Sequence, residues 1–218
     1  MKIPKIFHFI WIGPDPLPEE FKFYQQTWID LHPNWDIIIW GNNDIPPLIN
    51  QKEFNEAGIV LKVDLLKLEI LYKCGGVFVD SDFECYKNIE PLINNLEVFS
   101  AGEKEGIIGN AIMGSTPGNP IFKYLIEKAP QSIKENADFG PNVKTGPVFM
   151  TRTLNPEEIT VFGPELFFPT PPGHPSKTGL SHEFPKAYAN HHWAGSWIGK
   201  EDKKNWNKFV KTTKEGYD

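Results

Sequence analysis

The stretch "VDLLKLEILYKCGGVFVDSDFECYKNIEPL" (residues 63–92) decides the fold, because it predicts a helix, a turn and a strand in direct succession. The apolar positions of its first part cover most of the helical circumference, which indicates a helix buried on nearly all sides. Gly75 would supply the left-handed helix cap, and Gly76 would let the chain turn at once. Residues 77–79 then read as a short central strand that ends at Asp80.

The segments before this stretch extend it into an α/β fold. Residues 5–13 read as a first buried strand, residues 18–33 as an amphipathic helix, and residues 35–41 as a second strand rich in β-branched and aromatic residues. Strand, helix and strand in succession indicate a βαβ unit, and therefore a Rossmann-like, mostly parallel sheet flanked by helices. Later candidates are strands over 97–102, 107–115 and 160–169, helices over 119–129 and 146–154, and a long loop over 167–179.

The totals indicate an ordinary globular protein. With 218 residues, 40% hydrophobic and 23% charged, we expect a single domain over 1–218, in which about 200–218 is a polar tail. The net charge of -6 leaves no basic footprint for nucleic acid. No segment approaches the roughly 20 apolar residues of a membrane span.

The compartment can also be predicted. Pro4 and His8 interrupt the apolar N-terminal run, which is short and lacks a small-residue cleavage site, so a signal peptide is not expected. Cys74 and Cys85 are the two cysteines, and they imply no disulfide framework. We therefore expect a cytoplasmic protein.

Two like charges follow the central strand. In an extended chain, residues two apart face the same side, so Asp80 and Asp82 would present oxygens together, with Ser81 opposite. At the carboxyl end of a parallel strand, such a pair suits Mg²⁺ or Mn²⁺ with phosphate oxygens completing the shell. A solvated turn is the alternative, and the tripeptide alone does not decide between them.

Residues 63–92 resemble the glycosyltransferases of family 32, whose sugar-binding region contains a DXD motif. Residues 3–13 ("IPKIFHFIWIG") look like the first strand of that family, and residues 191–197 ("HHWAGSW") look like its C-terminal signature. The resemblance implies a GT-A fold, a nucleotide-sugar donor (UDP-sugar favoured), a divalent metal and retention of anomeric configuration. The acceptor would be a hydroxyl of a glycan or a glycoprotein.

The same resemblance implies roles for individual residues. Trp11 would stack on the nucleotide base, although a core tryptophan is an alternative. Asp64 would receive the ribose hydroxyls, although an N-cap is an alternative. Lys67 stands where the family usually carries arginine, and it keeps the charge but loses the bidentate geometry. Asn110 matches an asparagine that approaches the donor sugar, and a hydrogen-bonded structural asparagine fits equally well.

The C-terminal block implies a histidine that reaches the metal. His191 fits the motif better than His192, which strand alternation would aim the opposite way, and a structural histidine is the alternative. The implied site therefore consists of metal ligands, catalytic residues and donor-binding residues. They are Asp80, Asp82 and His191 (metal), Asp80, Asp82 and Asn110 (catalytic), and Trp11, Asp64, Lys67, Asp80, Ser81, Ser196 and Trp197 (donor).

Two competing functions remain open on the sequence. A phosphatase of the haloacid dehalogenase type also places DxD after an apolar strand, but "DSDFECY" (residues 80–86) lacks its usual continuation. A non-catalytic sugar- or nucleotide-binding module would suit the 13% aromatic content. Metal-dependent release of nucleoside diphosphate would separate an enzyme from such a module.

Overall fold

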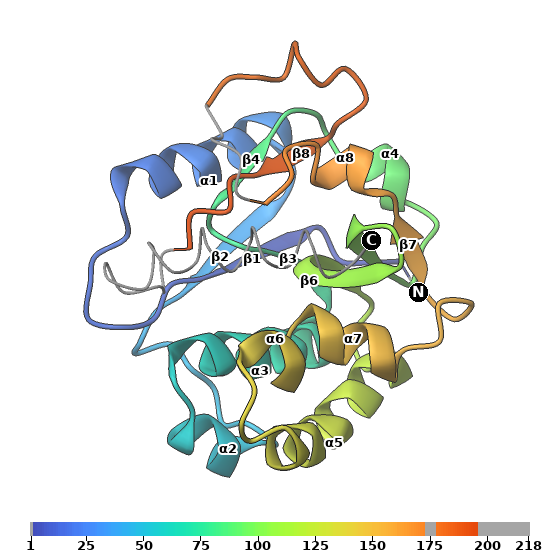
Figure 1. The fold of residues 1–218 in the computed structure, drawn as a ribbon. Helices are drawn as coiled ribbons and strands as arrows, with labels where there is room; N and C mark the ends of the chain where they lie inside the picture. Colours follow the sequence, from blue (N-terminus) through green and yellow to red (C-terminus); the bar gives the residue numbers. More distant parts are fainter. Residues whose placement is uncertain (1, 173–177, 196–218) are drawn as a thin grey trace.

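A six-stranded sheet with strand order β2-β1-β3-β6-β5-β7 forms the centre of the molecule in a computed structural model, which describes residues 2–172 and 178–195 (Figure 1). A two-stranded sheet pairs β4 with β8. The strands are β1 Ile6–Ile10, β2 Asp36–Trp40, β3 Gly76–Val79, β4 Phe83–Cys85, β5 Val98–Lys104, β6 Ile107–Ser115, β7 Thr160–Phe162 and β8 Ala189–His191. The helices are α1 Glu19–Leu31, α2 Gln51–Glu56, α3 Ile59–Cys74, α4 Glu90–Ile93, α5 Pro120–Glu135, α6 Pro141–Lys144, α7 Pro147–Thr153 and α8 Pro164–Phe167.

The sheet is mostly parallel, as the sequence predicted. Strand β1 pairs in parallel with β2 and β3, and β5 pairs in parallel with β7. Strand β6 runs antiparallel to both of its neighbours, β3 and β5. The five remaining strands therefore point the same way, and their carboxyl ends share one edge of the sheet.

Helices cover both faces of the sheet (Figure 1). Helices α3, α5 and α7 pack on one face, where Leu66, Phe122 and Phe149 belong to the same buried cluster as Phe78. On the other face, Trp28 of α1 joins a second buried cluster. Because the core has these two layers, both faces of β3 are apolar, which explains its continuous hydrophobic sequence.

The turn between α3 and β3 needs two glycines. Gly75 has φ 65° and Gly76 has φ 89°, a region that L side chains rarely adopt. A Cβ at Gly75 would lie 2.6 Å from Pro117 Cδ, and one at Gly76 would lie 2.7 Å from the Ile6 carbonyl oxygen. Gly75 is the C-cap, as predicted, but the predicted left-handed helical conformation was wrong, because its ψ of -155° lies in a region that is essentially restricted to glycine.

Two predicted boundaries were wrong by five residues or more. The strand expected over 160–169 ends at Phe162, because Pro164 starts the short helix α8 at its preferred first position. The helix expected to end at residue 129 continues through Pro130 to Glu135. Proline cannot donate to the Ile126 carbonyl oxygen, but the Asn50 side chain donates to that oxygen instead, at 2.8 Å.

Among residues 2–172 and 178–195, no helix combines the length and the apolar character that crossing a bilayer requires.

Two buried histidines are held neutral by their hydrogen bonds. His32 Nδ1 lies 2.9 Å from the Trp28 carbonyl oxygen, so it must donate, while its Nε2 accepts from the Ile89 N–H at 2.9 Å. His8 repeats this pattern between the Gly75 carbonyl and the Trp40 indole N–H. If either imidazole gained a second proton, that proton would face the N–H group that its ring nitrogen now accepts from. Burial accordingly lowers the pKa of His8 and of His32, against smaller opposing effects of their carbonyl partners.

We predict that His32 makes folding stability depend on pH. Its pKa is lower in the folded chain than in the unfolded chain, so its stabilisation is complete above about pH 6.5 and is lost as the pH falls below that value. The free energy of unfolding, measured in urea, should fall less between pH 7.5 and pH 5.5 in His32→Asn than in wild type. The difference should reach up to about 1.4 kcal/mol for each pH unit below 6.5.

Ile89→Ala serves as the control for this prediction, because it shortens a neighbouring buried side chain and leaves His32 in place. It should lower stability at both pH values and keep the wild-type pH dependence. An equal pH dependence in wild type and His32→Asn would contradict the assignment of His32 as a neutral buried group.

Candidate active site at the carboxyl edge of the sheet

The candidate site lies where β1, β3 and β5 end at the shared carboxyl edge. Trp11 follows β1, Asp80 follows β3, and Glu103 lies near the end of β5. Open α/β sheets bind ligands at this edge, where the last residues of neighbouring strands come together. The fold therefore gathers side chains that are far apart in the sequence.

Asp80 and Asp82 lie in a turn and not in an extended strand, which corrects the predicted geometry. The Phe83 N–H donates to the Asp80 carbonyl at 3.2 Å, and this bond closes the turn between β3 and β4. Ser81 is buried, and its hydroxyl donates to the Ile10 carbonyl at 3.3 Å. The carboxylates are still brought together, and the hydroxyl of Ser81 is directed at the end of β1.

Asp82 is bonded to the last residue of β8 and to the chain segment that follows it. Its Oδ1 lies 3.0 Å from His191 Nε2, and its Oδ2 accepts from the Ala194 N–H at 2.9 Å. His192 points elsewhere, with its Nε2 3.1 Å from Glu84 Oε2. The alternation expected for two adjacent strand residues therefore directs His191, and not His192, toward the aspartates.

Asp80, Asp82 and His191 form a group that can hold a metal ion. Each offers one ligand atom, and these atoms lie within 4.8 Å of one another. Ligands on opposite sides of a Mg²⁺ ion are about 4.2 Å apart, since each bond is about 2.1 Å long. His191 Nδ1 is buried without a hydrogen-bond partner among the described residues, so the ring has no second bond to hold it away from an ion. The donor set therefore fits a divalent cation.

A buried network lies beside this group. Asp64 Oδ1 is 2.9 Å from Lys67 Nζ and accepts from Asn110 Nδ2 at 3.0 Å. Asp64 Oδ2 accepts from the Thr145 hydroxyl at 2.7 Å. Asp64 is the sixth residue of α3 and not its N-cap, because the helix begins at Ile59. The N-cap alternative is therefore wrong, and Asn110 makes the hydrogen bonds of a well-held buried amide.

Lys67 joins the network to the aspartate pair. Its Nζ lies 3.8 Å from Asp80 Oδ1 and 4.9 Å from the centre of the Phe78 ring. Burial would lower the pKa of Lys67, but the charges of Asp64 and Asp80 outweigh this and raise it. Lysine is thus a permanent cation here, and it supplies a single charged donor where an arginine would supply a fork.

The carboxylates of the site perturb one another. Burial raises the pKa of Asp80 to about 6, against the Lys67 charge and together with the Asp82 charge. Burial also acts to raise the pKa of Asp82, but the His191 charge and the bonds from His191 and Ala194 hold it below its usual value. His191 responds in the opposite sense, since burial lowers its pKa but the nearby carboxylates raise it.

Glu103 is a site residue that the sequence analysis missed. Burial raises its pKa to about 7, and the charges of His191, Asp80, Lys67 and Asp64 all act on it. A Cβ at Gly109 would lie 2.8 Å from Glu103 Cγ, so the absence of a side chain at Gly109 makes room for this carboxylate. The strand predicted over 97–102 ended one residue before Glu103, and so gave no reason to place Glu103 at the edge of the sheet.

Trp11 lies at the rim of the site and is partly exposed. Its indole N–H donates to the Asp15 carbonyl at 2.9 Å, and its ring meets Phe21 edge-on at 5.5 Å. One ring face is therefore not required for core packing. Ser196 and Trp197, which were also predicted to contact the donor, lie outside the described residues.

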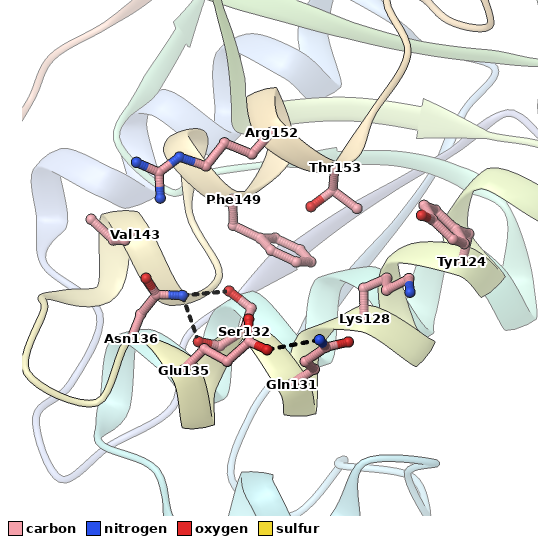
Figure 2. A pocket seen from close by; sticks show the side chains of 10 residues that line it. All are labelled: Tyr124, Lys128, Gln131, Ser132, Glu135, Asn136, Val143, Phe149, Arg152 and Thr153. Atoms are coloured by element: carbon pink, nitrogen blue, oxygen red, sulfur yellow. Dashed lines mark hydrogen bonds between the residues drawn. The ribbon is translucent and has the colours of Figure 1, made fainter.

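A separate surface groove lies between α5, α6 and α7 (Figure 2). Its walls include Lys128 and Arg152, and the amide and carboxylate groups along α5 bond to one another, as Gln131 does to Glu135 at 2.8 Å. None of the predicted site residues lines this groove. The chemistry is therefore concentrated at the edge of the sheet and not in this groove.

Comparison with known proteins finds several curated relatives that are named as mannosyltransferases. Inositol phosphoceramide mannosyltransferase 3 of Schizosaccharomyces pombe is 29% identical over 137 residues, which cover 59% of this chain and 38% of that protein. The chain therefore spans less than half the length of this curated relative. Residues 18–99 match a family model, and this range includes the helix, turn and strand that carry the aspartate pair.

Solved structures agree on the fold. PaToxG glycosyltransferase has a TM-score of 0.60 at 17% identity, covering 72% of this chain and 70% of its own. The galactosyltransferase LgtC, solved with donor and acceptor sugar analogues, has a TM-score of 0.54 at 9% identity and covers 95% of both chains. The fold is thus GT-A, as predicted. Residues 18–99 of the chain match the family model described as the glycosyltransferase sugar-binding region containing DXD motif.

Proposed function

We propose that the protein is a metal-dependent, retaining glycosyltransferase that moves a hexose from a nucleotide-diphosphate sugar to a hydroxyl of a glycan or a glycoprotein. The observation that supports this most is the group formed by Asp80, Asp82 and His191 at the carboxyl edge of the sheet. We further propose that the described residues form one catalytic domain, that the donor is a UDP-sugar and that the metal is Mn²⁺ or Mg²⁺.

Charge explains why a divalent cation suits this place. Four carboxylates, those of Asp64, Asp80, Asp82 and Glu103, face two cationic groups, Lys67 and His191. With all of them ionised, the cluster has two negative charges in excess. An anionic diphosphate would be repelled from such a cluster unless a divalent cation neutralised the excess.

Asp80, Asp82 and His191 would hold this cation. When bound, it would stabilise the negative charge that develops on the diphosphate leaving group. Lys67 would add a fixed positive charge beside Asp80, while Asp64 and Asn110 would orient hydroxyl groups of the donor. The two aspartates would act as metal and donor ligands and not as the acid/base pair of a glycosidase.

The alternatives receive less support. A haloacid dehalogenase-type phosphatase is disfavoured because the fold is similar to that of GT-A glycosyltransferases. A binding module without catalysis would share the metal group but release no product. Nucleotide sugars incubated with and without Mn²⁺ test both readings, because donor hydrolysis needs no acceptor. Metal-dependent release of nucleoside diphosphate supports a transferase, and its absence with every donor would contradict it.

We predict that Asp82→Asn abolishes metal-dependent donor hydrolysis, lowering the rate at least about 100-fold. The amide removes the charge of one metal ligand and leaves the packing of the turn nearly unchanged. Asp36→Asn, on the exposed surface of β2, is the control and should keep wild-type activity. Thermal unfolding should be similar for all three proteins. Equal turnover by Asp82→Asn and wild type would remove the argument for a metal site.

We predict that Trp11→Ala raises the donor KM. Stacking of an aromatic side chain on a base contributes about 1–3 kcal/mol, which corresponds to a KM increase of roughly 5- to 150-fold. Trp11→Phe, which keeps a ring face, should lie between Trp11→Ala and wild type. The concentration of Mn²⁺ needed for half-maximal rate should stay constant in this series. An unchanged donor KM would return Trp11 to a purely structural role.

A further inference from the structure

A second pair of a carboxylate and a histidine lies directly behind the proposed metal group. Glu84 and His192 each have 4% exposed side-chain surface, and His192 Nε2 lies 3.1 Å from Glu84 Oε2. Glu84 follows Asp82 by two residues on β4, and His192 follows His191 on the strand that pairs with β4. The metal group uses Asp82 and His191, so the proposed function gives this second pair no role.

Glu84 bonds to two separate stretches of the C-terminal region. Besides His192, its carboxylate oxygens accept from the Gly179 N–H at 2.9 and 3.2 Å. Gly179 has φ 74°, a conformation in which glycine is favoured. One buried carboxylate therefore joins the start and the end of residues 179–192 to β4.

His192 is held from its other side by an aromatic ring. Its imidazole is stacked on Tyr24 of α1, with ring centres 4.3 Å apart and an angle of 8° between the planes. Helix α1 also contacts β4, through the Trp28 indole N–H, which donates to the Phe83 carbonyl at 3.0 Å. The imidazole is thus fixed between a carboxylate on β4 and a ring on α1.

The chain between these contacts carries the groups that meet Asp82. His192 N–H donates to the Asp82 carbonyl at 2.9 Å, and Ala194 N–H donates to the Asp82 carboxylate at 2.9 Å. Strands β4 and β8 form a sheet of two short strands, and a pair of this kind is marginal without further support. The side-chain contacts of Glu84 supply that support.

We propose that Glu84 is a positioning residue, which acts through His192 and Gly179 to hold the segment 187–195 so that His191 reaches the proposed metal group. This inference rests on the proposed function, since it concerns His191 as a proposed metal ligand. The side-chain contacts of Glu84 that it invokes, to His192 and Gly179, lie outside that group. Residues that orient metal ligands from behind typically change metal affinity by 10- to 100-fold when removed.

The test uses Glu84→Ala with Glu84→Gln as its conservative partner. Glutamine retains an oxygen that can accept from Gly179 N–H, whereas alanine retains nothing. We expect Glu84→Ala to weaken Mn²⁺ binding, measured by titration calorimetry without donor, at least about 10-fold. Glu84→Gln should recover most of the affinity. Glu90→Ala, on α4, removes a carboxylate distant from the site and should bind Mn²⁺ like wild type.

Hydrogen exchange gives a readout that needs neither metal nor donor. The amides of His192 and Ala194 should lose protection in Glu84→Ala, while those of α3 and β3 should keep it. His192→Phe provides a second route, because it keeps a ring against Tyr24 and removes the bond to Glu84, and it should loosen the same amides. These measurements remain informative even if no nucleotide sugar is hydrolysed, so failure of the proposed function is distinguishable.

Three results would overturn the inference. Wild-type Mn²⁺ affinity in Glu84→Ala would show that the residue does not position His191. Full protection of His192 and Ala194 in both variants would show that the contacts do not hold the segment. A loss of protection that extends equally to α3 would show a role in general stability alone.

Discussion

The gathering of like charges at one edge of the sheet is the constraint on which the rest of the site depends. Four carboxylates meet there, and burial acts to raise the pKa of Asp80, Asp82 and Glu103. Lys67 on one side and His191 on the other offset part of this repulsion. Both cationic groups come from elements outside the β3–β4 turn, so the turn depends on tertiary contacts to keep its aspartates charged.

The two sides of the cluster are built differently. On the side of α3, both carboxylate oxygens of Asp64 are paired, with Lys67, Asn110 and Thr145 as partners. A buried carboxylate needs such pairing. On the side of β4, Asp82 is held by the ring of His191, at the end of β8, and by the backbone N–H of Ala194, which follows that strand. The first side is a rigid part of the core, and the second depends on how the C-terminal region is attached.

This difference suits a transferase that must admit and release a bulky donor. Contacts formed by the core can fix one wall of the site, while contacts from the segment that follows β8 can complete it. Buried polar groups beyond the site, such as Glu84 with His192, then matter because they determine where that segment lies. Gly76 and His8 have a comparable effect within the core. They let β3 lie close to β1, and this close approach sets the position of Asp80.

The sequence by itself determined the first strand–helix–strand unit, the mostly parallel sheet and the identity of the aspartate pair, because apolar periodicity and adjacent glycines act over a few residues. The short elements α2, α4, α6, β4 and β8 were not predicted. The two-residue spacing of Asp80 and Asp82 and the resemblance of three blocks pointed to the site. Only the tertiary structure decided that Asp64 lies inside α3, that Glu103 joins the site, and that Asn50 replaces the bond Pro130 cannot make. Asn50 and Ile126 lie 76 positions apart, and no local pattern records which distant partner will satisfy a buried charge or carbonyl.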